Sequence, residues 1–152
     1  MAFKLDLGTD KTIKVIVSKD NAIKGTSEED YEKYLNDLDE SHLKMAAGEE
    51  PTRFVLRKVL PYRDTKTVMN SQISFDEKTK KTQVNISFMM EEVRCALVGI
   101  EGPGGEQYKK DNDGAASKDI INYLYNAGVL MDLYNARKNA NGEAVSETVK
   151  KS

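Results

Sequence analysis

The sequence predicts an α+β protein in which a small antiparallel β-sheet, built from hairpins, packs against about three helices. Hydrophobic residues alternate with polar ones at Val84, Ile86 and Phe88, which is the spacing of a strand with one buried face. The spacing then changes to helical steps through Val93 and Leu97, and a glycine-rich stretch follows. This change of period within one segment is typical of a compact mixed core.

Length and composition favour a single domain. Of the 152 residues, 39% are hydrophobic and 32% are charged, which suits an ordinary globular core. We expect residues 1–140 to form this domain and residues 141–152 to be a flexible C-terminal tail. The formal charge of −2 provides no strong field for nucleic acid or an anionic membrane. No apolar run approaches the roughly 20 residues of a membrane span, and residues 1–11 lack the apolar region of a secretion signal. We therefore expect cytosolic synthesis and no membrane partner.

The first third of the chain predicts a hairpin, a helix and a strand. Residues 3–7 and 13–17 alternate around a Gly/Asp turn, as in a β-hairpin. Thr26-Ser27-Glu28-Glu29 has the pattern of a capping box at a helix start. An apolar stripe follows, before Gly48 and Pro51 end the helix: Tyr31, Tyr34, Leu35, Leu38, His42, Met45 and Ala46. Residues 52–60 then predict a third strand, which Pro61 ends.

The middle of the chain predicts a second hairpin and a second helix. The hairpin strands lie around residues 73–75 and 84–88, on either side of a charged turn over residues 76–81. Residues 62–70 fit a helical turn or a loop equally well. The helix is expected over residues 90–98, with Glu91 and Glu92 solvated at its start. Residues 99–114 are expected to be a flexible glycine-rich loop.

A single long helix is predicted near the C-terminus. It begins after Ser117, a good N-cap, with Asp119 placed favourably against the helix dipole, and it ends at Asn141-Gly142. Hydrophobic residues recur along it at four- and three-residue steps: Ile120, Leu124, Ala127, Met131 and Tyr134. Gly128 within the helix costs about 1 kcal/mol relative to alanine, so we expect a kink or a close helix contact there.

Candidate catalytic residues are few. His42 is the sole histidine and lies on the predicted apolar stripe, where a structural role is the favoured interpretation. Cys95 is the sole cysteine, so an intrachain disulfide is excluded, and burial is more typical of such a residue than a reactive thiolate. We expect no catalytic residue and no enzymatic activity.

Motifs for metals and nucleotides are also missing. Asp111-Asn112-Asp113-Gly114 resembles a calcium loop, but Lys109 and Ile120 stand where EF-hand ligands should be, so a turn with a left-handed glycine is expected. The glycines of residues 99–105 follow a helix, whereas a P-loop precedes one. The basic run at residues 78–81 is best interpreted as a solvated turn. We expect no metal and no cofactor.

One feature suggests a contact surface. The apolar seam of the last helix is wide for a chain of this size, and it either closes the protein's own core or docks a partner. Tyrosines such as Tyr108 and Tyr134 are of the kind enriched at interfaces. The candidate partner-binding residues are therefore Ile120, Leu124, Ala127, Met131, Tyr134 and Tyr108.

The order of three segments carries a family resemblance. They are Arg-Phe-Val-Leu-Arg-Lys-Val-Leu at residues 53–60, Glu-Val-Arg-Cys-Ala-Leu-Val-Gly-Ile-Glu-Gly at residues 92–102, and the helical stretch over residues 119–141. Together they resemble small proteins encoded among the tail and head–tail genes of tailed bacteriophages, including tail assembly chaperone-like proteins. This chain has Ile100 where many such proteins carry tryptophan.

The resemblance implies a non-enzymatic protein that is retained in the virion or escorts tail components in the host cytoplasm. Its partners would be other phage structural proteins or its own copies, bound through the seam and the loop over residues 99–114. A small-ligand-binding or regulatory α+β domain is the alternative, because a glycine-rich loop lies beside a helix. An enzyme using His42 or Cys95 is the least favoured hypothesis.

Overall fold

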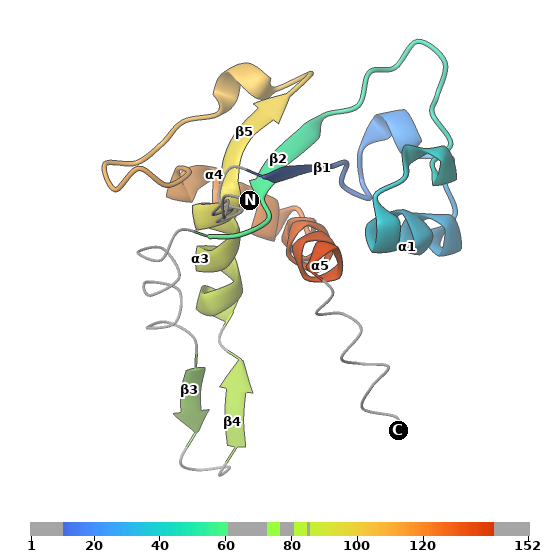
Figure 1. Ribbon diagram of the computed structural model, residues 1–152. Helices are drawn as coiled ribbons and strands as arrows, with labels where there is room; N and C mark the ends of the chain where they lie inside the picture. Colours follow the sequence, from blue (N-terminus) through green and yellow to red (C-terminus); the bar gives the residue numbers. More distant parts are fainter. Residues whose placement is uncertain (1–10, 61–72, 77–80, 85, 142–152) are drawn as a thin grey trace, which may run out of the picture.

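The computed structural model describes residues 11–60, 73–76, 81–84 and 86–141, and it has the predicted α+β class (Figure 1). A three-stranded antiparallel sheet has the order β1-β2-β5, and β3 and β4 form a separate two-stranded hairpin. The strands are β1 (Thr12–Val15), β2 (Arg53–Arg57), β3 (Ile73–Asp76), β4 (Lys81–Val84) and β5 (Leu97–Glu101). The α-helices are α1 (Glu28–Asp37), α3 (Ile86–Ala96), α4 (Lys118–Asn126) and α5 (Leu130–Ala140). Short 3₁₀ helices are η1 (Asn21–Ile23), η2 (Glu40–His42) and η3 (Gly105–Gln107). No helix of the described residues is long and apolar enough to cross a membrane.

The central strand β2 organises the sheet. It pairs with β1 on one side and with β5 on the other, and its residues alternate between buried and half-buried positions. Phe54 and Leu56 point into the core, as the strand predicted at residues 52–60 requires. The second predicted hairpin is present as β3 and β4, but β4 begins at Lys81, at the end of the predicted turn, and ends at Val84, where the second strand was expected to begin. The first strand of the predicted N-terminal hairpin lies outside the described residues.

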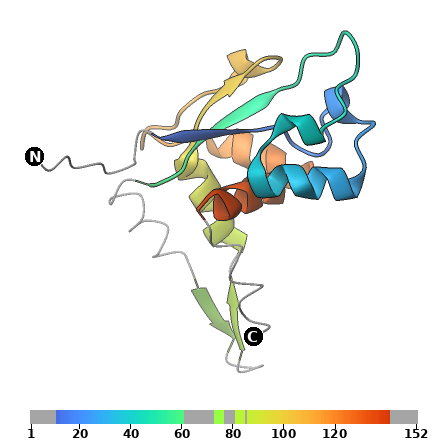
Figure 2. The same ribbon diagram turned by 45° about the vertical axis from the view of Figure 1, so that its right-hand side comes forward.

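The helices pack beneath the sheet, with α5 in contact with α1, α3 and α4 (Figures 1 and 2). The core lies between these layers and includes Ile16, Leu56, Leu97 and Leu133, each almost fully buried. Two tyrosine hydroxyls of α1 form hydrogen bonds with the backbone just beyond the end of β1. Tyr34 accepts from Ile16 N at 2.9 Å, and Tyr31 donates to Ile16 O at 2.7 Å. These bonds occupy backbone groups that would otherwise invite another strand.

The first helix is shorter than predicted and begins one residue later. Ser27, not Thr26, is the N-cap, and its hydroxyl accepts from Asp30 N. The helix ends at Asp37 because Leu38 adopts a left-handed conformation with φ of 57°. His42 therefore lies in the separate turn η2 and is not on the helix.

The prediction for residues 84–114 was wrong in two respects. Strand β4 ends at Val84, so Ile86 and Phe88 are the first helical residues of α3 and not the end of a strand. The helix ends at Ala96, and residues 97–101 form strand β5 in place of a helix end and a flexible loop. Long-range pairing with β2 explains the difference, because it places Leu97 opposite Leu56 in the core.

The predicted C-terminal helix is two helices. Gly128 has φ of +78°, a left-handed conformation that no continuous helix contains. Helix α4 ends before it and α5 begins after it. The kink expected at Gly128 is thus a complete break. Asn141 is the C-cap of α5, and the predicted tail beyond it lies outside the described residues.

Candidate functional site

A half-open groove of about 1110 Å³ lies between α4, the sheet and the segment around η3. Its apolar lining comes from three parts of the chain. Phe54 and Ile100 are cross-strand partners in β2 and β5, while Ile120 and Leu124 belong to α4. Tyr123 also lines the groove and is 71% exposed. Phe54 and Leu124 are buried in the core, whereas Ile100 and Ile120 are half-buried, so the accessible apolar surface of the groove comes mainly from Ile100, Ile120 and Tyr123.

Charged residues surround this apolar lining. The lysines are Lys19, Lys109 and Lys110, and the carboxylates are Asp20, Glu49, Glu50, Glu106, Asp111 and Asp119. Some of them hold the fold together: Asp20 accepts from the backbone N–H groups of Ala22 and Thr52, and Lys19 donates to Ala127 O. The groove is thus acidic on balance, with three lysines against six carboxylates.

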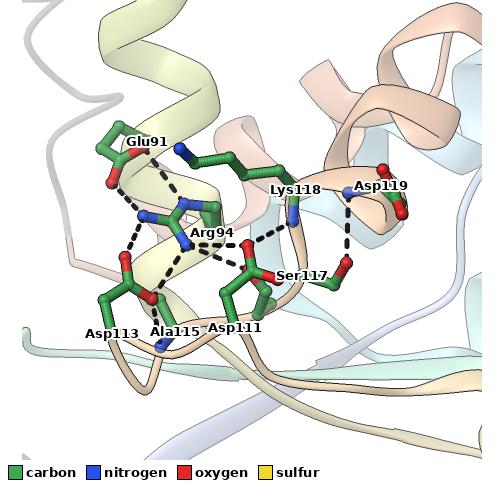
Figure 3. Close-up of polar contacts among 9 residues, drawn as sticks. Glu91, Arg94, Asp111, Asp113, Ala115, Ser117, Lys118 and Asp119 are labelled. Carbon is green, nitrogen blue, oxygen red and sulfur yellow. Dashed lines mark hydrogen bonds and ion pairs between the residues drawn. The ribbon is translucent and has the colours of Figure 1, made fainter.

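A buried arginine fixes the wall that precedes α4 (Figure 3). Arg94 of α3 is 4% exposed, and its guanidinium donates to Glu91, to Asp113 and to Ala116 O. Its Nη1 is also 3.7 Å from Asp111 Oδ2. These contacts tie the loop before α4 to the middle of α3.

The same contacts set the local electrostatics. Hydrogen bonds from Arg94, with a further one from Ala115 N, lower the pKa of Asp113 to about 2. The carboxylates of Asp113 and Glu91 in turn raise the pKa of Arg94 above its usual value. The loop is therefore held by ions that stay charged across the physiological range.

The start of α4 is capped as predicted. Ser117 Oγ accepts from Asp119 N at 3.1 Å, and Asp111 Oδ2 accepts from Lys118 N at 3.0 Å (Figure 3). Two of the N–H groups that a helix start leaves unpaired are satisfied in this way. Gly114 has φ of +85°, which confirms the predicted turn with a left-handed glycine.

The structure separates the six predicted partner-binding residues. Ile120, Leu124 and Ala127 line the groove. Met131 and Tyr134 follow the break at Gly128 on α5, away from the groove lining, with Met131 43% exposed. The sixth residue, Tyr108, is partly buried and donates to Leu97 O at 2.9 Å. The predicted seam is consequently not one continuous surface.

The loop over residues 99–114, which was also expected to bind partners, supplies Ile100 and Glu106, whereas Phe54 and Glu49 were missed. Phe54 and Ile100 face each other across β2 and β5, and the acidic residues Glu49 and Glu106 lie in connecting segments. The residues that come from the sheet are separated from α4 by long stretches of sequence. Only a correct strand pairing would have brought them together, and β5 was not predicted.

The prediction that Glu91 and Glu92 are solvated was wrong. They lie in the second half of α3, and Glu92 is 4% exposed. Its carboxylate accepts from Arg137 Nη1 at 2.6 Å and from Lys138 Nζ at 3.3 Å. Arg137 also donates to the carbonyls of Arg57 and Lys58, so the pair joins α3, α5 and the end of β2.

The residues considered for catalysis lie apart from the groove lining. Cys95 is 5% exposed within α3, as expected for a structural thiol. His42 Nε2 lies 2.8 Å from Asp37 Oδ2. With Asp39 these side chains form a cluster whose ligand atoms lie within 4.8 Å. Bonds from Asp39 N and His42 lower the pKa of Asp37, which is what a helix-end turn produces without an ion.

The groove is accordingly a surface suited to binding, with an exposed tyrosine and half-buried aliphatic side chains inside an acidic border. Comparison of the chain with protein families, with curated proteins and with solved structures found no match in any of the three.

Proposed function

We propose that this chain is a non-enzymatic structural or assembly protein of a tailed bacteriophage, which acts through protein–protein contacts in the tail or head–tail region. Its partners are other phage structural proteins or its own copies. The resemblance of residues 53–60, 92–102 and 119–141 to proteins encoded among phage tail genes supports the phage context. The groove beside α4 supports the mode of action.

The observation that carries the proposal is the size and openness of this groove. Pockets for small molecules are usually enclosed and measure about 300–1,000 Å³. This groove is half open and measures about 1110 Å³, and Tyr123 at its edge is 71% exposed. An exposed tyrosine beside aliphatic residues is typical of protein interfaces. A polypeptide fills such a groove better than a metabolite does.

The phage context is tested by mass spectrometry of purified particles and by the identity of the neighbouring genes. We expect the chain to be encoded among tail or head–tail genes. Its presence in particles would identify a retained component, and its absence from particles but presence in assembling cells would identify an escort. A neighbourhood without phage structural genes would contradict the proposal.

A thermal-shift screen separates this proposal from a small-ligand-binding domain. A ligand that binds only the folded state raises the melting temperature in proportion to its affinity and concentration. We expect no metabolite to raise it by several degrees. A specific metabolite that does so would favour the regulatory interpretation.

A further inference from the structure

Some of the charged side chains around the groove already form hydrogen bonds within the fold, and others do not. Asp20 and Asp111 accept hydrogen bonds from backbone N–H groups, and Lys19 donates to a carbonyl. These three residues hold loops in place, and their charges are partly compensated inside the fold. The remaining charged residues of the lining decide what the groove attracts.

Four carboxylates and two lysines remain exposed. Their side chains make no hydrogen bond or ion pair with any other residue that the structure describes: Glu49, Glu50, Glu106, Asp119, Lys109 and Lys110. The carboxylates come from the segment before β2, from η3 and from the first turn of α4, so they border the groove from separate sides. Their field favours a cationic partner and opposes phosphate groups.

The apolar lining has a periodicity of its own. Ile120, Leu124 and Ala127 are spaced by four and three residues along α4 and its C-cap. Leu124 is buried in the core, so α4 offers the half-buried Ile120 and the exposed Tyr123 to an occupant. On the sheet side, Phe54 is buried and the half-buried Ile100 lines the groove. An amphipathic segment can place apolar side chains between these two walls while its polar face stays in water.

We infer that the groove binds a basic amphipathic segment of a partner protein, with apolar side chains against Ile100, Ile120 and Tyr123, and with lysine or arginine side chains toward the carboxylates at the border. This inference rests on the proposed function and specifies the chemistry of the partner. The occupant is a peptide segment because the groove is half open and is edged by the exposed Tyr123, and it is basic because unpaired carboxylates outnumber unpaired lysines.

The test uses a library of random 16-residue peptides displayed on yeast and selected on the immobilised full chain. We expect the enriched peptides to carry net positive charge and apolar residues at three- or four-residue spacing. Their binding should fall at least tenfold in Tyr123→Ala and remain unchanged in Tyr125→Ala. Tyr125 is a matched control because it is 45% exposed on the same helix but does not line the groove.

Charge variants then separate the electrostatic contribution to peptide binding from the contribution of shape complementarity. In 50 mM salt, Glu49→Gln combined with Glu50→Gln should weaken binding of an enriched basic peptide by roughly three- to tenfold. Lys109→Gln combined with Lys110→Gln should strengthen it by a similar factor. The effect should shrink at 0.5 M salt, where charges at the border are screened. These four residues are exposed, so the variants should keep the fold.

Each other outcome is decisive. Neutral or acidic peptides that still depend on Tyr123 would overturn the inference and leave a protein-binding role in place. Peptides that bind Tyr123→Ala as well as the unmodified chain, or the absence of any enriched peptide, would overturn the groove as the binding site. Self-association of the chain that Tyr123→Ala abolishes would identify a second copy as the occupant and would also overturn the inference. Particle composition and gene neighbourhood test the phage context independently of all these results.

Discussion

Replacing Glu92 by leucine should destabilise the protein strongly, because it removes the buried carboxylate that pairs with Arg137 and Lys138. Glu92 and Arg137 are each 4% exposed, and their closest atoms are 2.6 Å apart. Leucine fills a similar volume, so a cavity contributes little. The guanidinium keeps its bonds to the carbonyls of Arg57 and Lys58 but loses the buried carboxylate of Glu92. Breaking such a pair from one side costs about 3–5 kcal/mol.

Urea unfolding at pH 7, followed by far-UV circular dichroism, measures this cost. With a slope of about 2 kcal/mol per molar, the midpoint of Glu92→Leu should fall by about 2 M with the slope unchanged. That loss is a large part of the roughly 5–15 kcal/mol that stabilises a domain. It should be visible in any preparation that folds.

The double variant Glu92→Leu with Arg137→Met is the control. It removes both charges of the Glu92–Arg137 pair, so neither is left in the core without the other. It also removes a donor to the carbonyls of Arg57 and Lys58, although Lys58 O still accepts from Asn141 Nδ2 at 2.9 Å. We expect the double variant to lose about 1–3 kcal/mol and to be more stable than the single one. A single variant within about 1 kcal/mol of the unmodified chain, or a double variant less stable than the single one, would refute the reasoning.

Three further variants test the parts that shape the groove and the sheet edge. Asp113 has a folded-state pKa of about 2 against an ordinary 3.8, so its contribution is present above pH 4 and is lost as the pH falls toward 2. Because its side chain is half exposed, Asp113→Asn should cost only about 1 kcal/mol at pH 6 and almost nothing near pH 2, in urea titrations at the two pH values. Gly128→Ala forces a left-handed alanine and should cost about 1–2 kcal/mol, whereas Gly99→Ala, which meets nothing within 4 Å, should cost less in the same assay. Tyr34→Phe leaves the buried N–H of Ile16 without its hydroxyl partner and should cost about 1–3 kcal/mol, with faster hydrogen exchange at that amide.

Each of these has a contrary result. If the loss of stability in Asp113→Asn did not change with pH, the ion pair would be excluded as its cause. Equal losses of stability in Gly128→Ala and Gly99→Ala would show that the left-handed conformation at Gly128 does not determine the cost of the substitution. A neutral Tyr34→Phe variant with unchanged exchange would show that the hydroxyl does not bind the backbone.

Local signals in the sequence predicted the elements that depend on neighbouring residues. Ser117 was predicted as an N-cap because a hydroxyl just before a helical period can accept a hydrogen bond from an N–H group of the first turn. Strand β2 followed from a run of β-favouring residues that Pro61 ends, and β3, with the presence of a hairpin, followed from alternation. The left-handed Leu38 carries no such signal, because leucine rarely adopts that conformation, and the first helix was therefore predicted to be too long.

Features that depend on distant residues were not predictable in this way. Residues 97 and 98 continue the helical spacing and residues 99–101 begin the glycine-rich stretch, and only pairing with β2 makes them a strand. Glu92 and Arg137 are 45 positions apart, so their partnership is invisible to local pattern, and a charged residue in a helix is normally solvated. Only part of the groove was predicted, for the same reason. The apolar spacing of α4 can be recognised from the sequence, whereas the part that the sheet contributes depends on strand pairing.

The central claim is that this chain acts by binding another protein through the groove beside α4. Sedimentation velocity of the purified chain with each product of its neighbouring genes tests this most directly. We expect one product to co-sediment with the unmodified chain and with Tyr125→Asp, but not with Tyr123→Asp, which places a charge in the groove. Co-sedimentation that Tyr123→Asp leaves intact, or no co-sedimentation with any neighbouring product, would contradict the claim.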